Sequence, residues 1–211
     1  MAVFQSGSGL APEWCELERF EIVELLPGDS YTFEQVLQKQ KLIVGRGRCR
    51  IVVNGVSITA DEGTNLDLER SDGRFEVLDV FQDATLICMD GRWGKETGES
   101  GIFNVSIDRS HLDRGDPVDY PKETTFDNHY HDCDEYWILF QGRGIAASEG
   151  KLYEVGPGDC VATGTGHHHD FPRVFEPVKA VFFETTMEGQ KRRGHLWDHT
   201  HGPAQPRADR V

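Results

Sequence analysis

The chain of 211 residues lacks long hydrophobic runs, paired cysteine motifs and an export signal. No apolar run approaches the roughly 20 residues that cross a bilayer. The stretch MAVFQSGSGLAPEW at the start has neither the basic nor the apolar region of a signal peptide. The cysteines are odd in number, far apart and never spaced as C-x-x-C: Cys15, Cys49, Cys88, Cys133 and Cys160. This pattern is typical of reduced thiols. We therefore expect a cytoplasmic protein without a membrane segment.

Positive charge is also scarce, since the chain has 22 lysines and arginines but 36 aspartates and glutamates, which gives a net charge of −14. Such a surface repels phosphate backbones and anionic lipids. We therefore expect neither nucleic acid nor membrane as a partner, and a small-molecule substrate instead. An anionic substrate stays possible, because one arginine in a pocket can dominate the local field.

Good helix patterns are scarce too, whereas glycine is abundant at 23 residues. Short runs of β-branched and aromatic residues recur between turn signals, which is typical of a β-sandwich or barrel. We expect strands within Phe20–Leu26, Lys41–Val44, Arg50–Val53, Phe75–Phe81, Thr85–Met89, Ile102–Ile107, Tyr136–Phe140, Lys151–Val155 and Ala180–Glu184. The predicted fold class is all-β.

The two halves share one pattern of apolar run, glycine turn, strand and second turn. Gly45-Arg46-Gly47 follows such a run, and Gly142-Arg143-Gly144 does so again, in the same order of features. Hairpin turns favour glycine everywhere, so coincidence is the alternative. We interpret the agreement as a duplication. It predicts one β-unit over residues 1–99, a second over 100–190 and a C-terminal tail over 191–211.

Histidine is absent from the first 110 residues, and all nine histidines follow. His129, His131 and Glu135 form an H-x-H-x-x-x-E pattern. Residues an even number of steps apart on a strand point to one face. Downstream, the turn Gly156-Pro157-Gly158-Asp159 precedes a strand that reaches His167-His168-His169. Imidazoles with a carboxylate suit a transition metal. Surface histidines are the alternative for the H-x-H pair alone.

Residues 129–142 resemble the first motif of the cupin family, and residues 156–169 are similar to its second motif. The resemblance implies jelly-roll barrels, also called double-stranded β-helices, with one divalent transition metal per chain: iron, manganese, zinc or nickel. It implies His129, His131, Glu135 and His169 as ligands. His167 stays an alternative to His169, because it has the same strand parity. The ligand positions map onto Thr32, Glu34 and Gln38 in the first half, so that barrel is expected to lack a metal.

The resemblance implies a metal-dependent enzyme acting on a small polar metabolite, a sugar, sugar acid or keto compound, by isomerisation, epimerisation or elimination. Glu184, or a pocket histidine such as His167, would move the proton. Glu184 could equally mark the solvent end of its strand. Trp137, Leu139 and Phe171 are expected to line the substrate pocket.

An iron(II) dioxygenase is the alternative activity, and a sugar-binding regulatory module without turnover is the third. We also expect a homodimer. The C-terminal segment could present His195 or Trp197 to substrate, or pack on a neighbouring subunit.

Overall fold

The computed structural model describes residues 3–7, 11–70, 73–108, 115–187, 189 and 203–211. All named elements of this part of the chain are strands, β1 to β12, so the predicted all-β class is confirmed. Within the same residues, no helix is long and apolar enough to cross a membrane.

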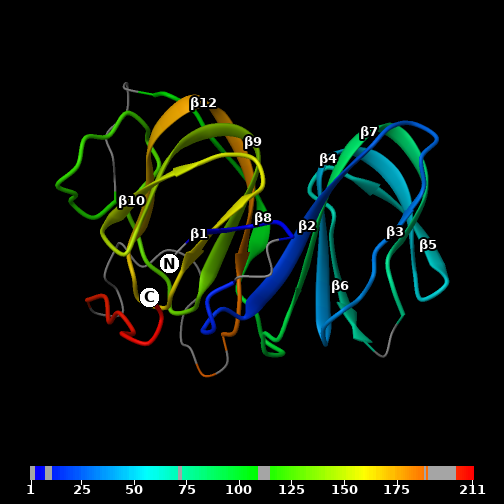
Figure 1. Ribbon diagram of the computed structural model, residues 1–211, viewed down its shortest axis with the longest axis horizontal. Coiled ribbons are helices and arrows are strands. Elements are labelled where there is room, and N and C mark those ends of the chain that lie inside the picture. The colour runs from blue at the N-terminus through cyan, green and yellow to red at the C-terminus, as the bar shows by residue number, and fades with distance from the viewer. Residues whose placement is uncertain (1–2, 8–10, 71–72, 109–114, 188, 190–202) are drawn as a thin grey trace. The chain divides into compact units, whose positions relative to one another are not determined.

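The strands divide between two compact units, each built on one six-stranded antiparallel sheet (Figure 1). The N-terminal unit comprises residues 6–11 and 16–93, and the C-terminal unit comprises residues 1–5, 12–15 and 94–211. The first sheet contains β2 Leu17–Leu25, β3 Tyr31–Thr32, β4 Lys39–Val53, β5 Val56–Asp61, β6 Asn65–Glu69 and β7 Glu76–Gly91. The second contains β1 Val3–Gln5, β8 Ser100–Val105, β9 Glu135–Ser148, β10 Lys151–Val155, β11 Asp159–Thr163 and β12 His169–Glu184.

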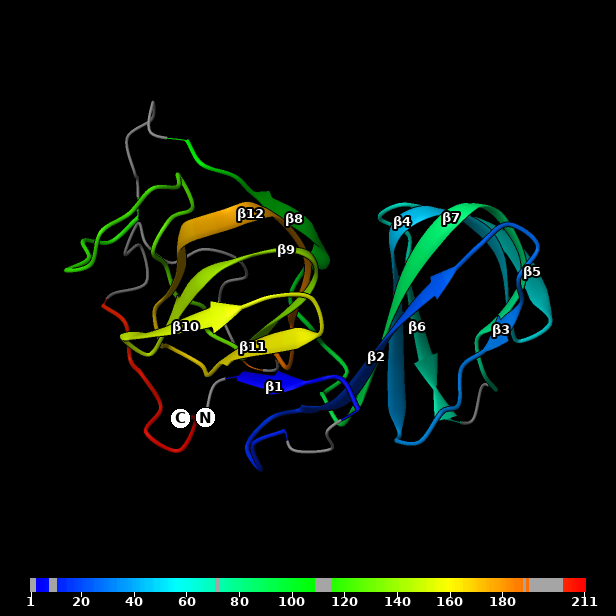
Figure 2. The ribbon, with the colours of Figure 1, turned by 45° about the horizontal axis from the view of Figure 1, so that its top comes forward.

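The two sheets repeat one topology. β4 pairs with β7 along its length, with β6 near its start and with β5 near its end. In the same way, β9 pairs with β12, β11 and β10. The outer strand β2 on β7 matches β8 on β12. Two long strands that exchange partners along their length curl each sheet into a jelly roll, as Figures 1 and 2 show.

The glycine triplets lie inside these long strands, not in hairpin turns as the sequence suggested. Gly47 interrupts the register of β4 on β7, and Gly142 interrupts that of β9 on β12. Both have positive φ, at 85° and 75°, and a Cβ there would collide with a carbonyl oxygen of the partner strand, that of Asp83 or Pro177. Only glycine accommodates such a bulge. The bulge lies at Gly47, the third residue of its Gly-Arg-Gly triplet, in the N-terminal unit, and at Gly142, the first residue of its triplet, in the C-terminal unit.

β1 belongs to the C-terminal unit, although the sequence-based division places it in the first half. Val3 to Gln5 pair antiparallel with Val161 to Asp159 of β11 (Figure 2). The strand thereby covers an edge that would otherwise present unpaired backbone groups.

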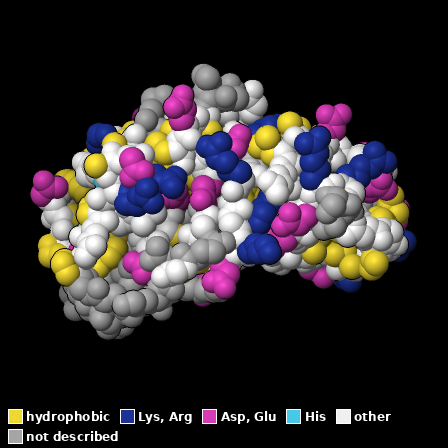
Figure 3. All heavy atoms as spheres, turned by 90° about the horizontal axis from the view of Figure 1, so that it is seen from below, with side chains coloured by type: hydrophobic (Ala, Val, Ile, Leu, Met, Phe, Trp, Pro, Cys, Tyr) yellow, Lys and Arg dark blue, Asp and Glu magenta, His cyan; other side chains and the backbone are white. Residues whose placement is uncertain are grey.

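Each unit has its own hydrophobic core. The N-terminal core includes the fully buried rings of Phe33 and Phe75. The C-terminal core includes Leu139, Phe171 and the indole of Trp137. At the surface, acidic and basic side chains are interspersed on the face drawn in Figure 3.

Candidate metal centre

Four buried side chains of the C-terminal unit converge at the ends of two neighbouring strands. Glu135 begins β9 and His169 begins β12, while His129 and His131 lie in the segment just before β9. His129 and His169 form an isolated antiparallel bridge, with N–H···O distances of 3.1 and 2.9 Å. The chain bends at residues 132 and 133, so the two histidines and Glu135 do not share one strand. The bend still returns Glu135 to the imidazoles.

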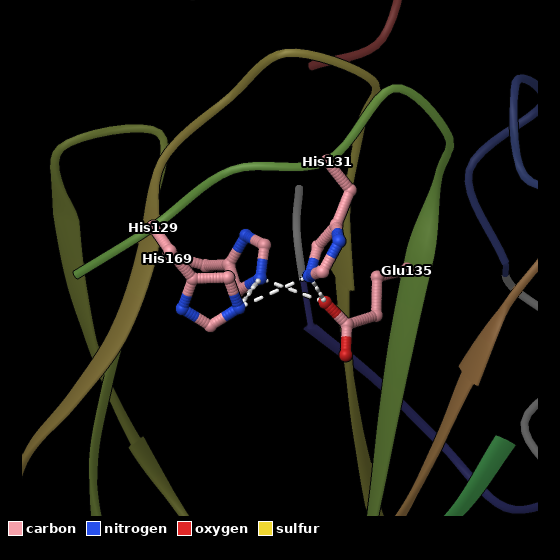
Figure 4. A group of neighbouring side chains, drawn as sticks. All are labelled: His129, His131, Glu135 and His169. Carbon is pink, nitrogen blue, oxygen red and sulfur yellow. Dashed lines mark hydrogen bonds and ion pairs between the residues drawn. The ribbon is translucent and has the colours of Figure 1, made fainter. Parts of the chain in front are cut away.

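The ligand atoms of the four side chains all lie within 4.8 Å of one another (Figure 4). His129 Nε2 is 3.0 Å from both His131 Nε2 and His169 Nε2. Glu135 Oε2 lies 2.9 Å from His131 Nε2 and 2.7 Å from His169 Nε2. Three imidazole nitrogens and one carboxylate oxygen therefore face a single point.

The opposite nitrogen of each imidazole faces an oxygen atom. His129 Nδ1 lies 2.9 Å from the Asp127 carbonyl, and His169 Nδ1 lies 3.3 Å from the His167 carbonyl. His131 Nδ1 lies 3.5 Å from Glu184 Oε1. The two carbonyl oxygens can only accept, so they favour hydrogen on Nδ1 of His129 and His169, which leaves the Nε2 lone pairs of these two imidazoles for the cluster. Metal-ligating histidines commonly have this arrangement.

Burial favours the neutral forms of His129 and His169, whereas neighbouring imidazoles favour the ionised form of Glu135. Burial lowers the pKa of His129 well below its usual value, and His169 and His131 lower it further. Burial also lowers the pKa of His169. For Glu135 burial acts in the opposite direction, but His131 and His169 still hold the pKa of its carboxyl well below the usual range. These are the protonation states in which both groups bind metals.

Glu184, the predicted proton carrier, ends β12 opposite Glu135. It is buried, and its Oε2 accepts a 2.9 Å hydrogen bond from the backbone N–H of Glu99. Burial raises the pKa of the Glu184 carboxyl. Its Oε1 faces His131, so Glu184 contacts a candidate ligand and does not mark the solvent end of its strand.

The other predicted proton carrier, His167, lies outside the cluster. His167 lies just before β12, and its Nε2 is 3.0 Å from the carbonyl oxygen of Arg207 in the C-terminal segment. It lines a separate cavity of about 720 Å³, where neighbouring His168 contacts Asp116 at 2.7 Å. The structure therefore brings His169, and not His167, to the other three candidate ligands.

A smaller cavity of about 260 Å³ lies beside the cluster. His129, His131 and Glu135 form part of the wall of this cavity. Of the predicted pocket residues, Trp137 lines this cavity, whereas Leu139 and Phe171 are fully buried in the core behind it. The remaining wall is made by Glu99, Phe103, Phe126, Asp127, Phe182 and Glu184. Sequence reasoning named only Glu184 of these six. The adjacency of Phe126 and Asp127 to the H-x-H pattern was the one available signal.

The C-terminal residues 203–211 pack against the loops that carry the ligands. Arg210 Nη1 lies 3.0 Å from Asp134 Oδ2, next to Glu135 in sequence, and donates to the Trp14 carbonyl. Asp134 also accepts two 2.8 Å hydrogen bonds from Thr165, in the loop before His169. His195 and Trp197 lie outside the described residues.

The strand pairing also identifies the equivalent positions in the N-terminal unit. Thr32 pairs with Glu76 where His129 pairs with His169. Lys39 pairs with Gly91 and Glu69, just as Glu135 pairs with Glu184 and Thr163. Lys39, rather than Gln38, is therefore the counterpart of Glu135.

The chain is 44% identical over 211 residues to the "Uncharacterized protein y4oW" of Sinorhizobium fredii strain NBRC 101917 / NGR234, which covers 100% of this chain and 97% of that protein. No protein-family model matches the chain.

Solved structures with little sequence identity share the fold. The protein YhaK from Escherichia coli matches with a TM-score of 0.53 and 14% identity, and the match covers 87% of this chain and 92% of the YhaK chain. Protein Ylba from E. coli matches with a TM-score of 0.52 and 12% identity, covering 90% and 92%. The 7S globulin of Momordica charantia matches with a TM-score of 0.52 and 12% identity, covering 86% and 78%. These likenesses concern the fold alone, and the predicted jelly-roll architecture with two similar units is confirmed.

Proposed function

Because the chain belongs to the family of the Sinorhizobium fredii protein y4oW and has the cupin fold, we propose that it is a metal-dependent enzyme acting on a small polar metabolite. His129, His131, Glu135 and His169 would hold one divalent transition metal in the C-terminal unit. The substrate would occupy the 260 Å³ cavity beside them.

One observation carries this proposal: three Nε2 lone pairs and one carboxylate oxygen converge at distances of 2.7–3.0 Å. When the three imidazoles are neutral with hydrogen on Nδ1, all four atoms are acceptors and repel one another, and a cation between them removes this repulsion. A buried, uncompensated group of this kind is costly. A divalent cation would bind all four atoms at once.

A cavity of about 260 Å³ lies beside these four side chains. It supports a catalytic role of the metal over a structural one, because structural sites are closed by their protein ligands.

The metal would supply a Lewis acid that polarises a carbonyl or neighbouring hydroxyl groups, for isomerisation, epimerisation or elimination of a sugar, sugar acid or keto compound. The residues around it have separate tasks. Trp137 orients Glu135 by a hydrogen bond, and the aromatic wall excludes water from the cavity. Glu184 lines the cavity with its carboxyl group and is our candidate for holding or moving the substrate proton.

An iron(II)-dependent dioxygenase is the second candidate. Four rings, those of Phe103, Phe126, Trp137 and Phe182, line the cavity. The ring centroids of Phe103 and Phe126 lie 5.3 and 5.2 Å from that of Trp137. Such a wall suits an aromatic substrate, and the same ligand set can hold iron.

Metal content tests the proposal. Untagged protein would be purified without chelators and analysed by elemental mass spectrometry, as wild type, His131→Ala and His167→Ala. We expect nearly one metal per chain in the wild type and in His167→Ala, and almost none in His131→Ala. Retention of the metal by His131→Ala, or no metal in the wild type even after reconstitution, would refute the site.

The identity of the metal then directs the activity assays. Iron together with oxygen uptake on phenolic substrates would favour the dioxygenase. Manganese, nickel or zinc without oxygen uptake would favour an isomerase or lyase on sugars. Stoichiometric metal without turnover in either screen would favour a binding module.

A further inference from the structure

The cavity beside the metal centre combines aromatic faces with carboxyl groups. The half-buried rings of Phe103, Phe126 and Phe182 form one part of its wall, and Trp137 lies deeper, next to His169, with ring centroids 5.1 Å apart. Glu99, Asp127 and Glu184 supply the polar part. The wall therefore offers apolar contact on one side and oxygen atoms on the other.

The carboxylates that form the polar part of the wall are hydrogen-bond acceptors. Ionised carboxylates accept hydrogen bonds and donate none. Among the described residues, no lysine or arginine lines the cavity. Glu99 and Glu184 are held together, because each backbone N–H donates 2.9 Å hydrogen bonds to the other residue: Glu99 N–H to Glu184 Oε2, and Glu184 N–H to the Glu99 carbonyl. Glu99 is exposed and lines the cavity, so it belongs to the part of the wall that is in contact with solvent.

We infer that the cavity binds a small donor-bearing molecule with an apolar face, a neutral alcohol, phenol or polyol or a cationic amine, and rejects small anions. This inference rests on the proposed function and names the substrate class of the same site. It narrows the substrate from sugars, sugar acids and keto compounds to their uncharged or amine-bearing members.

Two physical effects select for this class. Hydroxyl and ammonium groups can donate to the carboxylates of the wall, whereas a ligand carboxylate that faces Glu99, Asp127 and Glu184 meets acceptors and like charge. Aromatic faces attract cations through the ring quadrupole, and they pack equally well on the apolar face of a ring or a sugar. A volume of about 260 Å³ limits the ligand to a small metabolite.

Three probes that share one ring and differ only in the polar end would test the inference: benzylamine, benzyl alcohol and benzoate. Their binding to the full chain would be measured by isothermal titration calorimetry, with and without reconstituted metal. In the metal-free protein, where the wall alone acts on the probes, we expect benzylamine and benzyl alcohol to bind at least about tenfold tighter than benzoate, a difference of about 1.4 kcal/mol. The reconstituted protein then shows how far the charge of the metal changes this order.

Two variants would locate the effect. Glu99→Lys exchanges an exposed acceptor for a cation at the cavity, so it should weaken benzylamine binding and strengthen benzoate binding. Phe182→Ala removes part of the ring wall, so it should weaken all three probes by similar factors. Circular dichroism would confirm that both variants remain folded.

Benzoate binding to the metal-free protein as tightly as benzylamine, or no saturable binding of any probe, would overturn the inference. Unchanged affinities for benzylamine and benzoate in Glu99→Lys would also contradict it. Metal content distinguishes these outcomes from failure of the proposed function, because a protein that takes up stoichiometric metal but prefers benzoate when metal-free keeps its metal centre and loses only this assignment.

Discussion

The indole of Trp137 and the carboxylate of Glu135 are joined by a 2.8 Å hydrogen bond from Nε1 to Oε1 (the side chain of Glu135 is drawn in Figure 4). The other oxygen, Oε2, faces His131 and His169. The indole thus fixes which oxygen of Glu135 is directed to the candidate metal site. Partners of this kind orient metal ligands and tune their affinity.

Trp137→Phe should therefore weaken metal binding without removing a ligand. The phenyl ring keeps most of the apolar packing but cannot donate to Oε1. We expect the metal affinity to fall by about 10–100-fold, measured by competition with a chromogenic chelator. Trp93→Phe is the control, since it replaces a buried tryptophan of the N-terminal unit. An unchanged affinity in Trp137→Phe would show that Glu135 is oriented by other contacts.

Arg210→Ala should destabilise the C-terminal unit. The guanidinium lies 3.0 Å from the buried carboxylate of Asp134, and the substitution removes this ion pair. Breaking a fully buried pair costs about 3–5 kcal/mol. Because Arg210 keeps 20% of its side chain exposed, we expect a smaller loss of about 1–3 kcal/mol, measured by urea denaturation.

Arg207→Ala is the matched control for that variant. Arg207 pairs with Asp209 at 2.6 Å, but both side chains are more than half exposed, at 51% and 63%. Exposed ion pairs contribute less than about 1 kcal/mol. Equal destabilisation by the two substitutions would mean that the Asp134 contact has no special weight.

Asp90→Asn should change how stability depends on pH. Burial raises the pKa of the Asp90 carboxyl from 3.8 to about 6, and Gln40 donates a 3.2 Å hydrogen bond to it. The pKa of Asp90 in the folded protein exceeds its pKa in the unfolded chain, so the protonated carboxyl stabilises the folded state. This contribution is fully present at pH values below the pKa of the unfolded chain. It is lost as the pH rises through about 6.

The asparagine variant has no such titration, so the stability of the wild type should fall relative to that of the variant between about pH 4 and about pH 7. We expect a relative change of the order of 1 kcal/mol, after allowance for solvent screening. Chemical denaturation at several pH values measures it. Parallel stability curves for the two proteins would contradict the raised pKa.

The five cysteines should resist thiol reagents in the folded protein. All are free and buried, and burial raises the pKa of Cys15 to about 12 and that of Cys49 to about 11. The thiolate is the reactive form, so Ellman's reagent should react slowly with native protein. It should count five thiols after unfolding in guanidinium. Rapid reaction of the native protein would indicate an accessible thiolate.

The sequence by itself determined the all-β class, the duplicated architecture and three members of the candidate metal site, His129, His131 and Glu135. These features depend on local patterns, namely the strand period, the turn residues and the spacing of His129, His131 and Glu135. Such patterns are readable because neighbouring residues impose them directly.

Where strands continue or end was decided by the tertiary structure. Lys41–Val44 and Arg50–Val53 were predicted as separate strands, yet both lie in β4. Gly47 is accommodated there as a bulge, because β7 continues to pair on both sides of it. A glycine is compatible with either a turn or a bulge, and only the partner strand distinguishes the two.

The choice of His169 over His167 and the composition of the cavity also depend on distant contacts. His169 is set by its bridge to His129, 40 residues earlier, while His167 contacts Arg207, 40 residues later. Phe103 and Phe182 are brought together when β8 pairs with β12, and Phe126 comes from a third segment and contacts Phe103, with ring centroids 5.5 Å apart. Such contacts depend on packing between segments far apart in the chain, and local spacing carries no information about them.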